Sequence, residues 1–293
     1  MKPLWAYSLL LFAAAAWGSG FAVTKGALDQ LPPLVIMALR FGMATLIMLP
    51  FVYRRLRAAS RRIWRIGLPT GLFVFLGHLF QFLGMQYITA GESAFLSAVY
   101  VVLVPFIVWG LRGARPSGRH IAACCLCLLG GGVISLDGSL TAGAGEWMTL
   151  LGGICFALQI ACISRYAEGC DMLVVTWISV AVSAVCSLPA ALLVDWHAVS
   201  LSAQGILSAA YLAVVCSALA FSAQYTGLKY APPAIATMLL SLESVFGCLT
   251  GVVLLHEAVS GRMLVGCVII LASLLLGSTP DNNHIINNKR IRR

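Results

Sequence analysis

The sequence predicts an all-α polytopic membrane protein with ten transmembrane helices in two inverted five-helix repeats. Three observations support this fold class: the composition, the spacing of the apolar segments and an internal repeat. Hydrophobic residues make up 60% of the 293 residues, charged residues make up 10%, and the mean hydropathy is +0.95. Soluble domains carry about 25% charged and 45–50% apolar residues, so a lipid bilayer must be the solvent for most of this chain.

Ten apolar segments are long enough to cross a bilayer as helices, which takes roughly 20 residues each. They cover residues 4–24, 33–53, 64–88, 91–111, 119–136, 146–164, 171–194, 203–228, 232–255 and 262–278. Pro and Gly mark several of the links, which are too short to hold a soluble domain. The first segment lacks a small-residue cleavage site, which favours an uncleaved helix over a signal peptide.

The basic residues predict the orientation. With the N-terminus in the cytoplasm, 16 of the 19 Lys and Arg residues fall in the inner segments, as the positive-inside rule requires. The net charge of +9 therefore reflects topology, and we expect no nucleic-acid partner. We expect both termini on the cytoplasmic side of a bacterial-type inner membrane, with a disordered basic tail from 279 to 293.

An internal repeat appears when the chain is shifted by 143 residues. Ten of the 44 positions from 81 to 124 are then identical, including Gln81 with Gln224, against roughly three expected from average residue usage. The repeat divides the chain into residues 1–138, residues 139–278 and the tail 279–293. Because each half holds five helices, the second half must cross the membrane upside down. Inverted repeats are typical of secondary transporters, whose solute site lies near the midplane between the repeats.

Glu243 lies close to the bilayer centre, about 18 Å into its helix at 1.5 Å per residue. A carboxylate facing lipid there would cost several kcal/mol, so the side chain must face the bundle interior or water. One interpretation is that Glu243 binds protons or the solute, which makes it the candidate for proton coupling. The alternative is a structural carboxyl that hydrogen-bonds to a neighbouring helix.

Other polar and aromatic residues in the spans are candidates for lining a cavity. Arg40 could bind an anionic group, pair with an interior acid, or extend to the outer headgroups. His78 and Gln81 share a helix face, and Gln224 repeats Gln81, which fits either a symmetric cavity or hydrogen bonds between helices. Three aromatic residues could form walls for a small organic solute, or pack in the membrane interface: Trp17, Tyr100 and Trp177. Lys25, at a helix end, is interpreted as an interface residue.

The cysteines suggest neither disulfides nor a metal site. Cys124, Cys125 and Cys127 form a short cluster, but only His120 lies nearby in a spacing that a zinc site could use. We interpret them as small apolar side chains in a helix and expect no cofactor or metal.

Four stretches of the sequence resemble the drug/metabolite transporter superfamily, specifically its EamA-type permeases. They are AAAAWGSGFAVTK (13–25), PPLVIMALRFGMA (32–44), FLSAVYVVLVPF (95–106) and LLSLESVFGCLTGVVLLHE (239–257). The chain departs from the family pattern at Ser244, where Pro is common, and at Ala114, where Glu is frequent, although Glu257 keeps the second-half equivalent. The resemblance implies a cavity between helices 1–4 and 6–9, with helices 5 and 10 peripheral. It also implies transport of small metabolites, such as amino acids, without ATP.

We therefore expect a secondary transporter, not an enzyme, which moves a small organic metabolite by alternating access, with export and proton coupling as options. The alternatives are a passive facilitator or channel, and a polytopic membrane enzyme, which would need clustered catalytic groups. The five histidines are scattered along the chain, which argues against an enzyme. The sequence does not identify the solute or fix the oligomeric state, and it is compatible with a monomer.

Overall fold

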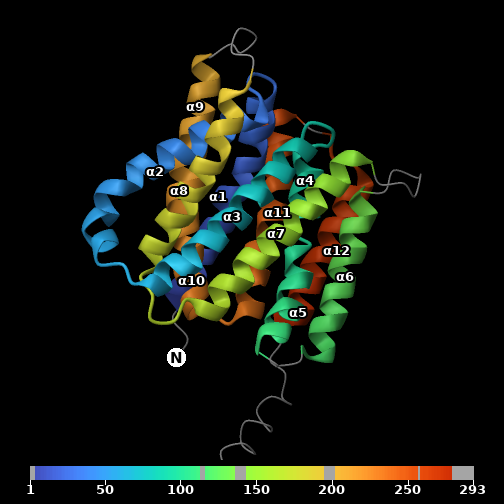
Figure 1. Ribbon diagram of the computed structural model, residues 1–293. Coiled ribbons are helices and arrows are strands. Elements are labelled where there is room, and N and C mark those ends of the chain that lie inside the picture. Colours follow the sequence, from blue (N-terminus) through green and yellow to red (C-terminus); the bar gives the residue numbers. More distant parts are fainter. Residues whose placement is uncertain (1–3, 113–115, 136–142, 195–201, 257, 279–293) are drawn as a thin grey trace, which may run out of the picture.

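The computed structural model describes residues 4–112, 116–135, 143–194, 202–256 and 258–278, and these residues form a bundle of helices (Figure 1). The first half contains α1 (Leu4–Leu28), α2 (Pro33–Arg57), α3 (Arg61–Gly84), α4 (Ala90–Ser97), α5 (Tyr100–Arg112) and α6 (Gly118–Ser135). The second half contains α7 (Ala144–Tyr166), α8 (Met172–Leu192), α9 (Ala203–Tyr211), the π-helix η1 (Leu212–Leu219), α10 (Ala220–Tyr230), α11 (Pro233–Leu255) and α12 (Gly261–Ser278). The expected tail and the boundary between residues 138 and 139 lie outside the described residues.

The all-helical membrane fold is confirmed. Within the described ranges, eight helices or runs of consecutive helices are long and apolar enough to cross a membrane. The remaining two predicted spans correspond to α6 and α12, which carry shorter apolar stretches at Ile121–Gly130 and Gly261–Ser273. Each of these helices is 18 residues long, which still reaches about 27 Å at 1.5 Å per residue.

The packing of the helices follows the internal repeat. α1 packs along α11, and their repeat counterparts, α7 and the α4–α5 pair, also pack together. Similarly, α3 packs along α7, and their counterparts, η1–α10 and α1, are in contact. Two pairs join a helix to its own counterpart, namely α2 with α8 and α6 with α12. Each contact between the halves thus recurs between the counterpart helices, or joins a helix to its own counterpart. This is the pattern that a twofold axis between inverted halves produces.

Two of the ten predicted spans are not continuous α-helices. The span predicted for 91–111 is divided into α4 and α5 by a turn at Ala98 and Val99. Beside this turn the Ser97 hydroxyl donates to the Ser93 carbonyl at 2.7 Å, a competing bond that bends helices. The span predicted for 203–228 contains the π-helix η1, a rare geometry that is frequent at functional sites.

Glycines allow the closest helix approaches between the halves. A Cβ atom added at Gly18 of α1 would lie 2.8 Å from the Glu243 carbonyl oxygen and 2.9 Å from the Gly247 nitrogen of α11. The Thr250 hydroxyl of α11 donates to the Gly18 carbonyl at 3.0 Å. The backbones of α1 and α11 therefore touch at this level, as small residues permit in membrane helices. This contact fixes the depth at which Glu243 stands beside α1.

We expect Gly18→Ala to destabilise the protein by about 1–3 kcal/mol, because the added methyl group meets backbone atoms that cannot turn aside. Gly42→Ala is the matched control, since no atom lies within 4 Å of a Cβ added at Gly42. The control should leave stability unchanged or slightly higher, because Ala is the better helix former. The measurement is the thermal melting temperature in detergent, and equal values for the two variants would contradict this account.

Candidate functional site

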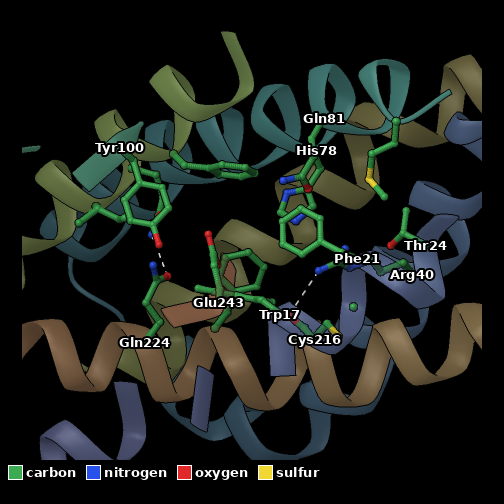
Figure 2. Close-up of a pocket in the computed structure, with 16 residues that line it drawn as sticks. Trp17, Phe21, Thr24, Arg40, His78, Gln81, Tyr100, Cys216, Gln224 and Glu243 are labelled. Atoms are coloured by element: carbon green, nitrogen blue, oxygen red, sulfur yellow. Dashed lines mark hydrogen bonds between the residues drawn. The ribbon is translucent and has the colours of Figure 1, made fainter. Parts of the chain in front are cut away.

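A cavity lies between the two halves of the bundle (Figure 2). Its empty space is about 550 Å3, including the part that opens to solvent. The lining residues are Trp17, Gly20, Phe21, Thr24, Arg40, His78, Gln81, Met85, Tyr100, Phe156, Gln159, Ile160, Cys216, Phe221, Gln224 and Glu243. As the resemblance implies, α6 and α12 stand outside the cavity, and α8 also lines none of it.

The cavity brings together residues that are equivalent in the two repeats. The shift of 143 residues relates Gln81 to Gln224 and Tyr100 to Glu243, and all four line the cavity. Extended by three residues, the same shift relates His78 to Phe221, which also lines it. The axis between the repeats therefore passes through the cavity, at the place where inverted-repeat transporters hold their solutes.

Glu243 faces the interior from the middle of α11. Its side chain is 6% exposed, and it forms no ion pair with any residue that the structure describes. Figure 2 shows Tyr100 and Gln224 at the same end of the cavity as Glu243. An acid that lies in the membrane without a cation partner must be neutral, solvated in the cavity or matched by a bound cation.

Arg40 is buried, with 3% exposure, so the interpretation that it extends to the headgroups is wrong. Its Nε donates to the Ser217 hydroxyl at 2.7 Å, and one terminal nitrogen donates to the Cys216 carbonyl at 3.4 Å, both in η1. The guanidinium also lies over the rings of Phe41 and Phe82, at 5.1 and 5.9 Å from their centroids. Since Arg40 makes no ion pair with a described residue, its remaining donors are available to an anion in the cavity.

His78 stands among aromatic rings. Its Nδ1 donates to the Val74 carbonyl at 2.8 Å, which leaves Nε2 as the free ring nitrogen. Four rings surround it edge-on, with centroids at 5.0 to 5.9 Å: Phe41, Phe82, Phe156 and Phe221. His78 therefore forms part of an aromatic wall with one polar atom left for hydrogen bonding.

The glutamines combine both roles that the sequence left open, cavity lining and helix–helix hydrogen bonding. Gln81 donates to the Ser97 hydroxyl at 2.8 Å, beside the turn that separates α4 from α5. Gln159 donates to the Gln224 side-chain oxygen at 3.3 Å, which joins α7 to α10. Each of these amides can form further hydrogen bonds besides the one described.

The two tryptophan candidates have different positions. Trp17 lines the cavity, and its Nε1 donates to the Cys216 carbonyl at 2.8 Å. The same carbonyl accepts from Arg40, so the wide turns of η1 offer one carbonyl to both residues. Trp177 is not among the lining residues, because its indole turns toward α2 and donates to the Thr45 carbonyl at 3.0 Å.

Sequence reasoning missed several lining residues. Phe221 could have been found by applying the repeat shift to His78, and Gln159 by its polarity within an apolar segment. Phe21, Phe156 and Cys216 carry no such signal, since apolar residues look alike on the lipid and cavity sides of a helix. The described residues contain no group of three or more His, Cys, Asp or Glu side chains that could hold a metal ion.

We compared the sequence with protein families and with curated proteins. The sequence profile of the EamA-like transporter family matches residues 4–136 and again residues 143–279. An uncharacterised transporter of Archaeoglobus fulgidus is 29% identical over 281 residues, which cover 95% of this chain and 87% of that protein. A probable amino-acid metabolite efflux pump of Escherichia coli is 26% identical over 284 residues, which cover 92% of this chain and 93% of that protein.

A crystal structure aligns with a TM-score of 0.74 and 20% identity, over 93% of this chain and 96% of that chain, which supports the fold alone. The two profile matches together span almost all of the sequence. They coincide with the two halves whose helices exchange partners about the cavity. The chain therefore belongs to the EamA-like transporter family.

Proposed function

We propose that this transporter moves a small zwitterion of the amino-acid class through the cavity by alternating access, in the direction of export. The observation that carries the proposal is the pair of opposite charges, Arg40 and Glu243, that line one cavity without forming an ion pair. Arg40 suits the carboxylate of the solute, and Glu243 suits its ammonium group. Figure 2 shows the two side chains from different helices, with Trp17 and Phe21 drawn between them.

The names of relatives support the solute class and the direction. The relatives named as probable amino-acid metabolite efflux pumps come from Escherichia coli and Salmonella typhimurium, and both alignments cover 92% of this chain. We further propose that both termini face the cytoplasm of a bacterial-type inner membrane, from the distribution of Lys and Arg. Proton coupling through Glu243 belongs to the same proposal, and a passive facilitator is the alternative.

The test is solute counterflow in proteoliposomes that contain the purified protein. Small amino acids should exchange with saturation, whereas their decarboxylated amines and their N-acetyl derivatives should exchange at least tenfold more slowly, since each lacks one of the two charges. A pH gradient should accelerate net movement if Glu243 carries a proton. Exchange that is equally fast for all three kinds of compound would refute the zwitterion proposal, and flux without saturation would favour a channel.

A further inference from the structure

A small packed cluster of buried residues lies beside the cavity, near Lys25, and we call it the Lys25-end cluster. It consists of Phe21 in α1, Met85 after α3, and Ala90 and Ala94 in α4, all at most 5% exposed. Phe21 and Met85 also line the cavity, so each residue borders the cavity and packs in the cluster.

Lys25 hydrogen-bonds to the backbone at Met85, one residue of this cluster, and at Ile88. Its Nζ donates to the carbonyls of Met85 and Ile88, the second at 2.9 Å. These carbonyls lie just beyond the C-terminus of α3, where helices leave carbonyls without partners and favour a positive charge. Lys25 is therefore a tether between α1 and the turn after α3, a role that the sequence did not predict.

The turn that Lys25 holds is fixed on its far side as well. Thr89 and Glu92 form a capping box that begins α4, with the Thr89 hydroxyl accepting from the Glu92 amide at 3.1 Å. In α4, the Ala94 carbonyl accepts from the Ser244 hydroxyl of α11 at 2.9 Å. Ser244 directly follows Glu243, so the cluster is joined to the helix position that carries the cavity acid.

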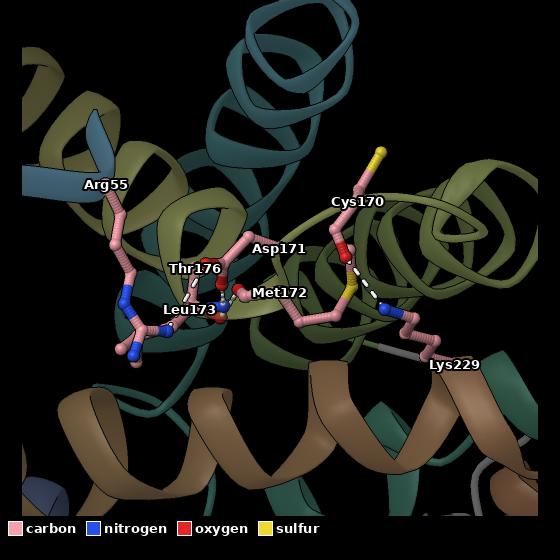
Figure 3. Close-up of polar contacts among 7 residues, drawn as sticks. All are labelled: Arg55, Cys170, Asp171, Met172, Leu173, Thr176 and Lys229. Atoms are coloured by element: carbon pink, nitrogen blue, oxygen red, sulfur yellow. Dashed lines mark hydrogen bonds and ion pairs between the residues drawn. The ribbon is translucent and has the colours of Figure 1, made fainter. Parts of the chain in front are cut away.

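The opposite end of the bundle has a tether of the same chemistry. Lys229 at the end of α10 donates from Nζ to the Cys170 carbonyl at 2.8 Å, in the turn after α7 (Figure 3). Beside it, Arg55 of α2 pairs with Asp171 at 3.3 Å. Within the first half, Lys25 joins the first helix, α1, to the turn after the third helix, α3. Lys229 joins the third helix of its half to the turn after the first. Each half thus carries one lysine tether, and inversion places the two tethers at opposite membrane faces.

We propose that Lys25 is a positioning residue of the transport cycle, which holds Met85 over the cavity in the conformation closed at its end. This inference rests on the proposed alternating access, because that mechanism requires the Lys25 end to open in turn. When the end opens, Met85 must leave Phe21, and the two ammonium–carbonyl contacts must be released. Removal of the ammonium group should therefore shift the population toward the conformation open at this end.

The experiment measures access to the cavity instead of transport, so its failure is distinct from failure of the proposed solute. Cys216 lines the cavity and serves as the reporter in a full-length variant whose other cysteines are replaced by Ala or Ser. A charged, membrane-impermeant thiol reagent is applied to intact cells and, separately, to inverted vesicles. Tyr87→Cys, at a residue 68% exposed in the held turn, identifies which preparation presents the Lys25 end.

Lys25→Met should raise the labelling rate of Cys216 from the Lys25 end at least tenfold, because it removes two charge-assisted hydrogen bonds, each of which contributes about 1.5–3 kcal/mol. Lys25→Arg, which keeps a donor cation, should restore a rate close to that of the parent. Lys229→Met is the matched control at the opposite end, and it should leave this rate unchanged or lower it. Melting temperatures of all variants separate a shifted population from general loss of structure.

An unchanged rate in Lys25→Met, or the same increase in Lys25→Arg, would overturn the proposal. So would an equal increase in Lys229→Met. If Lys25→Met cannot be purified in folded form, Met85→Ala decides by the same measurement, since it removes the side chain that closes the cavity while Lys25 remains. In that case a rate equal to that of the parent overturns the proposal, and a clear increase from the Lys25 end supports it.

Discussion

Glu243→Gln is expected to lower amino-acid transport at least tenfold and to flatten its dependence on pH. The amide keeps the size of the side chain but can neither release a proton nor attract an ammonium group as strongly, and hydrogen bonds to charged groups contribute about 1.5–3 kcal/mol. Glu243 lines the cavity and has no ion-pair partner among the described residues. The substitution should therefore reduce solute binding and transport without breaking an ion pair. The measurement is counterflow in proteoliposomes at several pH values.

Glu92→Gln provides the matched control for the same chemical change. Glu92 is in the capping box at the start of α4, a position where Gln functions as well as Glu. Its rate and pH profile should equal those of the parent protein. A Glu243→Gln variant with an unchanged rate and pH profile would remove this residue from the mechanism and leave it a structural carboxyl.

Arg40→Lys is expected to weaken the apparent affinity for amino acids by roughly tenfold to a hundredfold. Lysine keeps the charge but loses the planar set of donors that can hold Ser217 and a carboxylate at the same time. The KM in counterflow reports this effect. Arg55→Lys is the control, because Arg55 makes an exposed ion pair with Asp171 that contributes little.

A comparison of amino acids with their methyl esters separates a solute role of Arg40 from a structural one. The parent protein should prefer the free carboxylate, and Arg40→Lys should lose most of that preference. If the variant weakens both compounds equally, Arg40 acts by joining α2 to η1 and does not contact the solute.

Much of the fold followed from the sequence because membrane solvent constrains it so strongly. Each span has to satisfy its own backbone hydrogen bonds, so apolar length alone located the ten crossings. The site was also partly predictable, since polar side chains are expensive in lipid and therefore point inward. By this reasoning Glu243, Gln81 and Gln224 were expected near the cavity, and the structure places all three on its wall.

The features that sequence reasoning missed depend on backbone geometry and on apolar contacts. The turn after Ser97 and the π-helix η1 arise within apolar runs that read as continuous helices. Trp177 was a cavity candidate only because it is aromatic, but its indole nitrogen donates a hydrogen bond to the Thr45 carbonyl of α2. The partners of Lys25 are also carbonyls, which every residue possesses, so no residue pattern could have indicated the tether.

The equivalence of Tyr100 and Glu243 bears on how such a chain can arise by duplication. A dimer of two identical second halves would place two carboxyls where this chain has one carboxyl and one phenol. Two acids facing the same cavity would repel each other if both were ionised. In a single polypeptide the two halves need not be identical, and here one position is an acid while its counterpart is a phenol. A single acid opposite a neutral ring is thus an arrangement that a symmetric dimer of identical halves cannot have.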